Sequence, residues 1–307
     1  MNLRDLEYLV AVADELHFGR AAERCNASQP ALSGQLRKLE DNLGVKLFER
    51  TKRHVRITEV GAEIAEIAQD ILKKVGLMRE VALSNADPLS GSFTLGAPPT
   101  IGPYIAPLLL KSAKHYMPNL RLELVEDLTQ NLEQQLSDGD LDAALLATHP
   151  THMTLAEIAL YDEPFWVALP RDHSMADEDA LDASAINPSE LLLLADGHCL
   201  RDQIYEACKI KTSSAKGDKG PKTQRTSLST ILTLVGSGMG VTLVPATSLS
   251  GSWVTDGGVV VRPERSGTAG RKVWLVHRKA YHRMPLVEKL ADVIVASMPN
   301  TVTPTRR

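Results

Sequence analysis

Apolar residues in the first forty-four positions of the chain recur at the spacing of α-helices. They predict an amphipathic helix over residues 3–14, a short second helix over 18–24, and a third helix between Ser28 and Gly44. Ser28 is a good N-cap, Pro30 is tolerated in a first helical turn, and glycine readily takes the conformation that ends a helix. Two short helices, a tight connection and a third helix describe a helix-turn-helix.

The third predicted helix has one apolar and one polar side. Its apolar side is expected to form one buried stripe from Leu32, Leu36, Leu39 and Leu43. Its opposite side presents Pro30, Ser33, Gly34 and Arg37, with Gln29 at the exposed N-terminal end. In a helix-turn-helix the N-terminal residues of such a helix contact base edges in the major groove of DNA. A three-helix packing unit without nucleic acid gives the same periodicity.

The segment after the third helix is predicted to be a basic wing. Residues 44–58 hold five basic side chains against Glu49 alone. Basic side chains on a wing contact phosphates, which makes binding independent of sequence and sensitive to salt. The net charge is −4, yet the first 58 residues hold ten Lys and Arg against eight Asp and Glu. This distribution suits a small polyanion-binding module joined to an acidic body, although a solvated charged loop explains it equally well.

A long helix is predicted from about residue 59 to residue 83. Its heptad seam over about three repeats consists of Ile64, Ala68, Ile71, Val75, Met78 and Ala82. Such a seam is typical of a dimerisation helix, and a single packed surface helix gives the same pattern. The turn-rich residues 85–91 then predict a hinge. We therefore expect domains over residues 1–58 and 91–307, joined by a linker helix and hinge over 59–90.

Short apolar strands alternate with helical stretches from residue 92 onward. The alternation predicts an α/β domain with largely parallel sheets, and about 215 residues are enough for two lobes. The expected strands cover residues 92–97, 121–126, 143–147, 165–169, 191–194, 240–244 and 272–276. The expected helices cover residues 104–116, 129–136, 201–209, 228–235 and 285–297.

The composition is that of an ordinary globular protein, with 43% hydrophobic and 23% charged residues. No apolar stretch approaches the roughly 18 residues of a membrane-spanning helix, so we expect no membrane association. The N-terminus lacks a signal-peptide pattern, and three cysteines make no paired disulfide framework. The sequence therefore predicts a cytoplasmic protein. Aromatic residues, at 4%, argue against a stacking platform for single-stranded nucleic acid.

Residues 21–50, AAERCNASQPALSGQLRKLEDNLGVKLFER, carry a specific signature. They resemble the winged helix-turn-helix of LysR-type transcriptional regulators, which makes a packing unit without nucleic acid the weaker interpretation. The resemblance places six side chains at double-stranded DNA: Gln29, Pro30, Ser33 and Arg37 face the duplex, with Arg50 and Arg53 near its backbone.

The same resemblance has consequences for assembly and for the larger domain. It implies pairing through the linker helix, and hence a homodimer or tetramer on a pseudo-palindromic site, with RNA polymerase as a further partner. It also implies that residues 91–307 form a periplasmic-binding-protein-like effector domain, in which a cleft between two α/β lobes takes a small ligand.

Two cysteines stand close together in residues 197–208. Cys199 has His198 beside it and Arg201 two residues on, near the start of a predicted helix. Cationic neighbours and a helix N-terminus both favour the thiolate, which is the reactive form. Cys208 follows nine residues later, which on one straight helix is about 13.5 Å along the axis. A disulfide needs Cα atoms roughly 4.4–6.8 Å apart, so bonding would require this segment to unwind, as in a switch.

Other interpretations of the cysteines remain open on the residues alone. The spacing by itself favours two inert cysteines in a core, and Cys25 on the second helix is expected to be core as well. A zinc site is weaker, because His198, Cys199 and Cys208 lack a fourth ligand at the usual spacing. We therefore expect neither a metal nor a cofactor.

Residues 197–203, GHCLRDQ, followed by Cys208, resemble the redox segment of the hydrogen-peroxide-sensing regulators in the LysR family, and the likeness runs over nearly the whole chain. It implies that Cys199 is oxidised to a sulfenic acid and that Cys208 resolves this acid to a disulfide. It also implies a peroxide pocket around the reactive sulfur, formed by Thr100, Thr129, His198, Arg201, Asp202 and Arg271. The lysine-rich residues 211–224 depart from the family pattern by their length.

Together these features predict a DNA-binding transcriptional regulator, not an enzyme, that senses hydrogen peroxide through a reversible Cys199–Cys208 disulfide. One alternative is a LysR-type regulator that responds to a small organic effector in the cleft between its lobes. A second alternative, a two-cysteine thiol peroxidase, is disfavoured by the N-terminal module.

Overall fold

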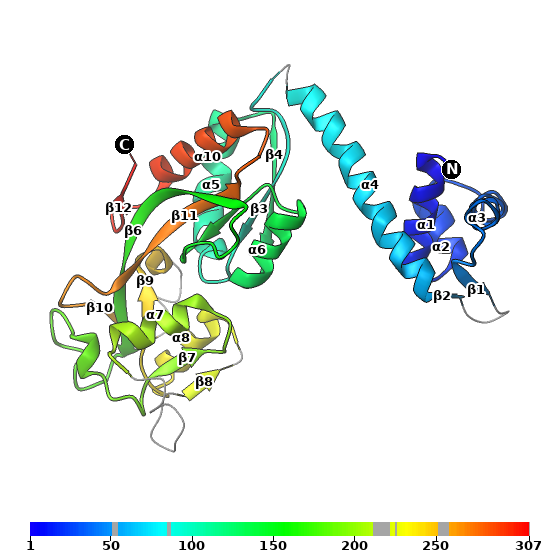
Figure 1. Cartoon of the computed structure of the whole chain (residues 1–307). Helices are drawn as coiled ribbons and strands as arrows, with labels where there is room; N and C mark the ends of the chain where they lie inside the picture. Colours follow the sequence, from blue (N-terminus) through cyan, green and yellow to red (C-terminus); the bar gives the residue numbers. More distant parts are fainter. Residues whose placement is uncertain (51–54, 85–86, 211–221, 225, 251–257, 307) are drawn as a thin grey trace. The chain divides into compact units, whose positions relative to one another are not determined.

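The chain divides into two compact units, Met1–Ala86 and Asp87–Arg307. The computed structural model describes residues 1–50, 55–84, 87–210, 222–224, 226–250 and 258–306 (Figure 1). Among these residues, none of the helices combines the length and apolar character that crossing a membrane requires.

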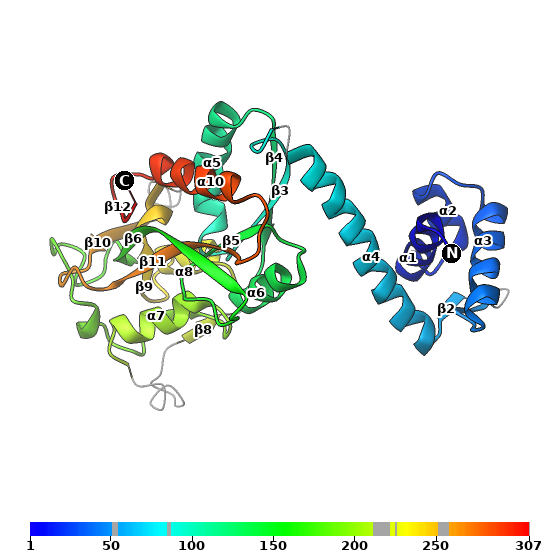
Figure 2. The ribbon, with the colours of Figure 1, turned by 45° about the horizontal axis from the view of Figure 1, so that its top comes forward.

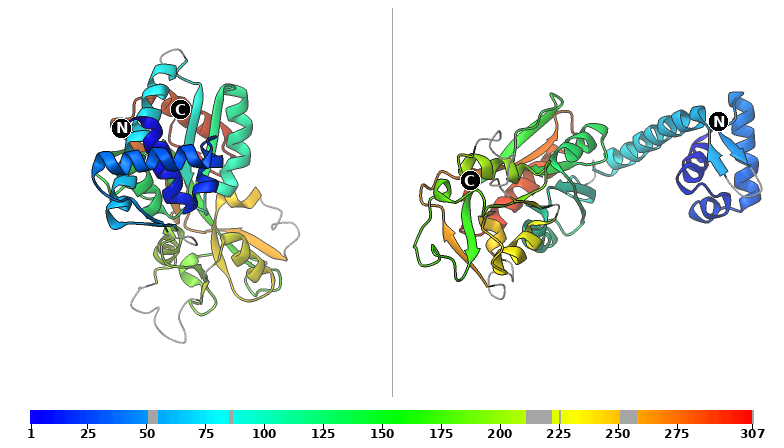
Figure 3. Two further views of the ribbon diagram at one scale, coloured as in Figure 1. Left: turned by 90° about the vertical axis from the view of Figure 1, so that its right-hand side faces the viewer. Right: turned by 90° about the horizontal axis from the view of Figure 1, so that it is seen from below.

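The first unit packs three helices together and continues through a short hairpin into one long helix. Its helices are α1 (Leu3–Glu15), α2 (Phe18–Arg24), α3 (Gln29–Leu43) and α4 (Glu59–Ser84). Its strands are β1 (Phe48–Arg50) and β2 (Val55–Ile57), which pair antiparallel. The predicted helix-turn-helix and wing base are thus confirmed, and α4 is one uninterrupted helix (Figure 3).

Local caps explain where the helices of the first unit begin and end. Asn2 and Asp5 form a capping box at α1, and the side chain of His17 caps α2. Ser28 Oγ accepts the Ala31 N–H at the start of α3, and Gly44, with a φ of 71°, ends that helix.

The leucine stripe of α3 is shorter than predicted. Leu32, Leu36 and Leu39 are fully buried, but Leu43 is 38% exposed. Leu43 is the last residue of α3, where the chain turns away at Gly44, so the core of the unit does not reach it.

The heptad seam of α4 splits into two parts with different surroundings. Ala68 is buried in the core of the first unit, and Ile64 and Ile71 pack against that core. Met78, further along, is 71% exposed. The first half of the seam therefore packs within the unit itself, and pairing with a second copy stays a prediction for the later turns.

The second unit is built on an eight-stranded mixed sheet in the order β10-β6-β11-β5-β3-β4, with β9 and β12 also paired to β6. Its strands are β3 (Gly91–Ala97), β4 (Leu120–Glu126), β5 (Ala143–Leu146), β6 (Leu155–Pro170), β9 (Thr242–Pro245), β10 (Val259–Pro263), β11 (Gly270–Arg278) and β12 (Thr303–Pro304). A separate parallel pair consists of β7 (Leu192–Leu194) and β8 (Lys222–Gln224). The helices are α5 (Gly102–Tyr116), α6 (Thr129–Asp138), η1 (Ala183–Ala185), α7 (Cys199–Ala207), α8 (Leu228–Gly236), η3 (Ala246–Ser250) and α10 (Met284–Ser297).

The expectation of largely parallel sheets is wrong. β3 pairs parallel with β4 and β5, but β11 runs antiparallel to both β5 and β6. β9, β10 and β12 also run antiparallel to β6. The reason is the length of β6, which covers 16 residues and serves as the central partner for strands that return along it.

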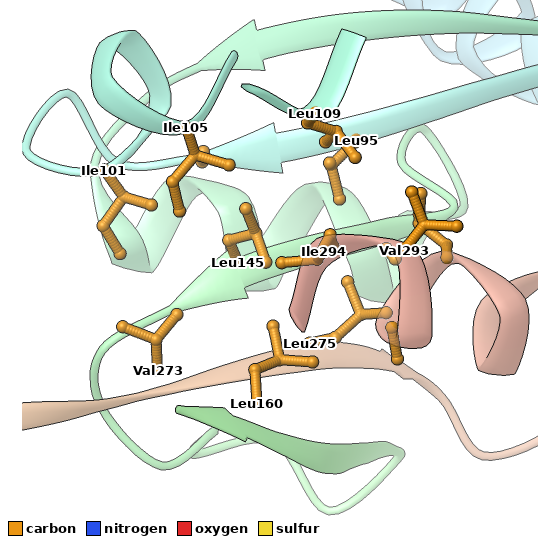
Figure 4. Close-up of a cluster of buried hydrophobic side chains, with 14 of the residues drawn as sticks. Leu95, Ile101, Ile105, Leu109, Leu145, Leu160, Val273, Leu275, Val293 and Ile294 are labelled. Atoms are coloured by element: carbon orange, nitrogen blue, oxygen red, sulfur yellow. The ribbon is translucent and has the colours of Figure 1, made fainter. Parts of the chain in front are cut away.

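The two predicted lobes are separate hydrophobic cores that share β6. The first core gathers β3, β5, β11, α5, α10 and the first half of β6, and the second gathers β7, α7, α8, β9 and the second half of β6. In the first lobe, α5 and α10 lie side by side over one face of the sheet (Figure 2). Leu145 and Leu275 point into this core (Figure 4), while Leu146 and Val276, one residue on, face α6 across the sheet.

Candidate functional site

The polar face of α3 lies on the surface of the first unit. Gln29, Pro30 and Arg37 are exposed, Ser33 is partly exposed, and a Cβ added at Gly34 would meet no atom within 4 Å. The exposed face is therefore the one that the sequence predicts to approach DNA. Arg53 and the side chain of Arg50 lie outside the described residues.

A contact that the sequence did not predict orients α3. Gln35 Nε2 donates a hydrogen bond of 2.7 Å to Oδ1 of Asp5, the buried carboxylate of the α1 capping box. The helix that would enter the groove is thus tied to the start of α1. No local pattern reveals this pair, because thirty positions separate the two residues.

We expect Arg37→Ala to weaken binding to the DNA upstream of the chain's own gene by about 1–3 kcal/mol, because a good base contact carries that much discrimination. The control is Lys38→Ala, which removes the same charge from the next position of α3. Fluorescence anisotropy with specific and random duplexes measures both variants. An unchanged ratio of specific to random affinity in Arg37→Ala would show that this face of α3 is not the one that recognises bases.

The two cysteines predicted to be redox partners stand at opposite ends of α7. Cys199 is the first helical residue and Cys208 is the C-cap, so the helix separates them by about 13.5 Å along its axis. Both thiols are free. Cys199 occupies the helix N-terminus, where the N–H groups of the first turn lack partners within the helix.

The two thiols also lie in different cores. Cys199 packs against the core of the first lobe, whereas Cys208 is buried within the core of the second. Burial, together with the carboxylates of Asp182 and Glu264, raises the pKa of Cys208 to about 12. At neutral pH Cys208 is therefore a protonated thiol.

Arg271 is buried and forms hydrogen bonds to Glu163 and to Thr100, of which Thr100 is one of the predicted pocket residues. Its Nε donates to Glu163 Oε2 at 2.7 Å, directly across the β11–β6 register. Its Nη1 and Nη2 donate to the side-chain and main-chain oxygens of Thr100 at 3.2 and 2.9 Å. Burial acts to lower the pKa of Arg271, but the charges of Glu163 and Cys199 outweigh it and raise that pKa. Arg271 is thus close enough to Cys199 for their charges to interact.

The cation beside Cys199 differs from the one that the sequence suggested. Burial lowers the pKa of His198, so its ring is neutral at pH 7. Arg201 forms an ion pair with Asp196 and lies 5.5 Å over the ring of Tyr205. Arg271 therefore brings a positive charge from within the fold that interacts with Cys199.

The predicted pocket residues fall into two hollows. His198 and Arg201 line a hollow of about 880 Å³, together with Pro99, Leu128 and Ser227. Cys199, Thr129 and Asp202 line a second hollow of about 630 Å³. The buried pair Thr100–Arg271 lines neither of them.

Thr129 brings an open hydrogen-bonding group to the hollow of Cys199. It begins α6, is 9% exposed, and its Oγ1 has no hydrogen-bond partner among the described residues. A buried hydroxyl without a partner is costly, so it is suited to a bound polar molecule. Thr148 and His149, which lie on the same hollow, were not predicted.

Two family models match the chain over both units. Residues 3–62 match the bacterial regulatory helix-turn-helix protein of the lysR family, and residues 86–299 match the LysR substrate binding domain. The chain therefore belongs to the LysR family of DNA-binding transcriptional regulators, which are not enzymes, so the thiol peroxidase alternative is excluded.

Within that family, the chain is similar to OxyR regulators of several bacteria. The hydrogen peroxide-inducible genes activator of Pectobacterium carotovorum subsp. carotovorum is 40% identical over 96% of each chain. A cysteine-to-aspartate variant of full-length OxyR from Pseudomonas aeruginosa is 37% identical, with a TM-score of 0.73 over 100% of this chain and 98% of that one. An H₂O₂-bound cysteine-to-serine variant of Corynebacterium glutamicum OxyR is 35% identical, with a TM-score of 0.66 over 96% and 92% of the two chains.

Proposed function

We propose that this regulator senses hydrogen peroxide through Cys199 and stores the signal as a Cys199–Cys208 disulfide. The observation that carries the proposal is the position of Cys199, at a helix N-terminus, in a hollow with the unpaired hydroxyl of Thr129, and within reach of the charge of Arg271. The similar proteins support it, because they are named for induction by peroxide and one was solved with H₂O₂ bound.

The first chemical step is attack of the Cys199 thiolate on one oxygen of hydrogen peroxide. The S–O bond forms as the O–O bond breaks, and the departing hydroxide takes a proton to leave as water. The product is a sulfenic acid at Cys199. In this scheme Thr129 Oγ1 orients the peroxide, Asp202 faces it across the same hollow, and Arg271 stabilises negative charge on the sulfur and the leaving oxygen. Thr100 holds Arg271 in place, and His198 and Arg201 border the site from the neighbouring hollow.

The second step joins the two sulfurs. Cys208 gives up its proton and attacks the Cys199 sulfenic acid, and water leaves as the disulfide forms. Because α7 separates the sulfurs by about 13.5 Å along its axis, the helix must unwind before a bond that needs Cα atoms roughly 4.4–6.8 Å apart can form. Loss of α7 is therefore the structural change that carries the signal.

The assembly follows from the DNA-binding unit. We propose that two or four copies pair through α4, that they bind a pseudo-palindromic duplex in the cytoplasm, and that they contact RNA polymerase there. The exposed Met78 and the later turns of α4 would supply the pairing surface. Refolding around α7 would then change the spacing of the DNA-binding units on their site.

The test combines mass spectrometry of the peroxide-treated full chain with footprints on the DNA upstream of its gene. We expect a Cys199–Cys208 bond together with a shifted footprint, both reversed by a thiol reductant. If the footprint is the same before and after oxidation, the chain is instead a regulator of the organic-effector type.

We expect Thr129→Val to slow formation of the Cys199 sulfenic acid by roughly tenfold or more, because it removes a placed donor without changing side-chain shape. The control is Thr148→Val on the same hollow, which should react at the wild-type rate. Trapping the sulfenic acid with a dimedone probe over time measures the rates. Equal rates in Thr129→Val and wild type would remove Thr129 from the peroxide pocket.

A further inference from the structure

Glu40 is a buried carboxylate on the helix that faces DNA, and it holds the base of the wing. Its side chain is 2% exposed. One oxygen, Oε1, accepts the backbone N–H groups of Leu47 at 2.9 Å and Phe48 at 3.3 Å. Phe48 is the first residue of β1, so a hydrogen bond from its N–H joins the first residue of the wing strand to α3.

The other end of the hairpin is tied to the same short segment. Thr58, which follows β2, donates its hydroxyl to the carbonyl oxygen of Lys46 at 2.7 Å, and its N–H to that of Leu47 at 3.0 Å. Thr58 Oγ1 also accepts the N–H of Gly61 in the first turn of α4. A Cβ at Gly61 would lie 2.2 Å from the Leu47 carbonyl oxygen, so only glycine permits this close approach. The N–H groups of Leu47 and Phe48 therefore bond to α3, and the carbonyls of Lys46 and Leu47 bond to Thr58, the residue before α4.

The hairpin held in this way presents positive charge. Arg56 on β2 is exposed, and Lys46 at the hairpin base is 72% exposed. A hollow of about 300 Å³, lined by Arg37, Glu40, Asp41, Lys46 and Phe48, lies between α3 and the hairpin base. The distance between the cations of α3 and those of the hairpin thus depends on the hydrogen bonds that join the two elements.

We propose that Glu40 is a positioning residue for DNA binding: as a hydrogen-bond acceptor, it fixes the wing relative to the recognition helix, so that the wing cations meet DNA phosphates. The reach of Glu40, rather than its charge, is the essential property. Both N–H groups bond to Oε1, so the length of the side chain decides whether they are reached, whereas Oε2 lies 3.7 Å from Nζ of Lys46.

Three substitutions separate the effect of the length of the Glu40 side chain from the effect of its charge. Glu40→Gln keeps an oxygen at the Oε1 position and loses the charge, whereas Glu40→Asp keeps the charge and cannot reach the two N–H groups. Glu40→Ala loses both. The matched control is Asp41→Asn, which removes one charge from the exposed neighbouring position of the same helix.

The experiment measures binding of the full chain to a random-sequence DNA duplex as a function of salt, below the unfolding temperature of each variant. The slope of log affinity against log salt falls by about 0.9 for every phosphate that the protein no longer neutralises. We expect Glu40→Asp and Glu40→Ala to reduce the slope by at least one such step. In Glu40→Ala this reduction should occur although removal of a negative charge alone would strengthen binding. Glu40→Gln and Asp41→Asn should keep the full slope. Arg56→Ala should lower the slope in wild type and leave it unchanged in Glu40→Asp.

Each outcome bears on the proposal. A full slope in Glu40→Asp shows that the acceptor does not position the wing, and a reduced slope in Glu40→Gln assigns the effect to the charge. Additive losses in the Arg56 and Glu40 double variant show that the two act independently. If Glu40→Ala fails to fold, the Asp and Gln variants still decide the question.

Discussion

Replacing Cys199 with serine is expected to abolish the peroxide response while leaving DNA binding intact. Serine lacks the polarizable thiolate that attacks the O–O bond, and the rest of the hollow cannot replace it. Cys208→Ser should behave differently, because Cys199 still reacts and a sulfenic acid accumulates without a disulfide. Footprints before and after peroxide, with mass spectrometry of the same samples, measure both effects. Cys25→Ser is the control and should respond as wild type.

The order of the two reactions follows from the surroundings of the thiols. With its pKa raised to about 12, Cys208 is almost entirely protonated at neutral pH, and it is buried in the second core. Iodoacetamide should therefore label Cys199 much faster than Cys208 in the reduced chain. A Cys199→Ser variant that still shifts its footprint with peroxide, or faster labelling of Cys208, would assign the sensing role to another residue.

Glu163→Ala is expected to destabilise the second unit by about 3–5 kcal/mol, because it leaves the buried guanidinium of Arg271 without its carboxylate. Glu163 also accepts the N–H and hydroxyl of Thr247, so the substitution removes two further buried hydrogen bonds. For a unit of this size the loss corresponds to roughly 10 °C in the unfolding temperature. Calorimetry of the full chain measures it.

The neighbouring carboxylate provides the control. Asp162 forms a pair of 3.2 Å with Lys272 in which both side chains are partly exposed, so Asp162→Ala should cost at most about 1 kcal/mol. Equal losses of unfolding free energy for the two substitutions would mean that the Glu163–Arg271 pair contributes no more to stability than the Asp162–Lys272 pair. A large loss for Glu163 alone supports a buried network that holds Arg271 in place.

Much of the first unit could be predicted from its sequence, because its signals are local. Ser28 and Gly44 mark the ends of α3 within the helix itself, and the leucine periodicity gives the buried side. The sheet of the second unit could not be predicted in the same way. The first ten residues of β6 mix polar and apolar side chains and end in Pro164, so this part lacks the continuous apolar run of a central strand.

The same distinction applies to the functional residues. Cys199 and Cys208 stand out because they share one short helix. Glu163 and Arg271 meet only through the pairing of β6 with β11, 108 positions apart, and this pairing was missing from the predicted sheet. Glu40 contacts residues seven and eight positions on, but only the turn at Gly44 brings their N–H groups to it.

The packing of α7 sets how readily the proposed sensor resets. Leu200, Ile204 and Tyr205 hold the helix in the second core, and the disulfide can form only when these side chains leave it. Every 1.4 kcal/mol of packing energy forfeited on oxidation raises the reduction potential of the cysteine pair by about 30 mV. If the proposed disulfide forms, the apolar side chains of a nine-residue helix therefore set the oxidant level at which the regulator switches and the ease with which thiols reduce it again.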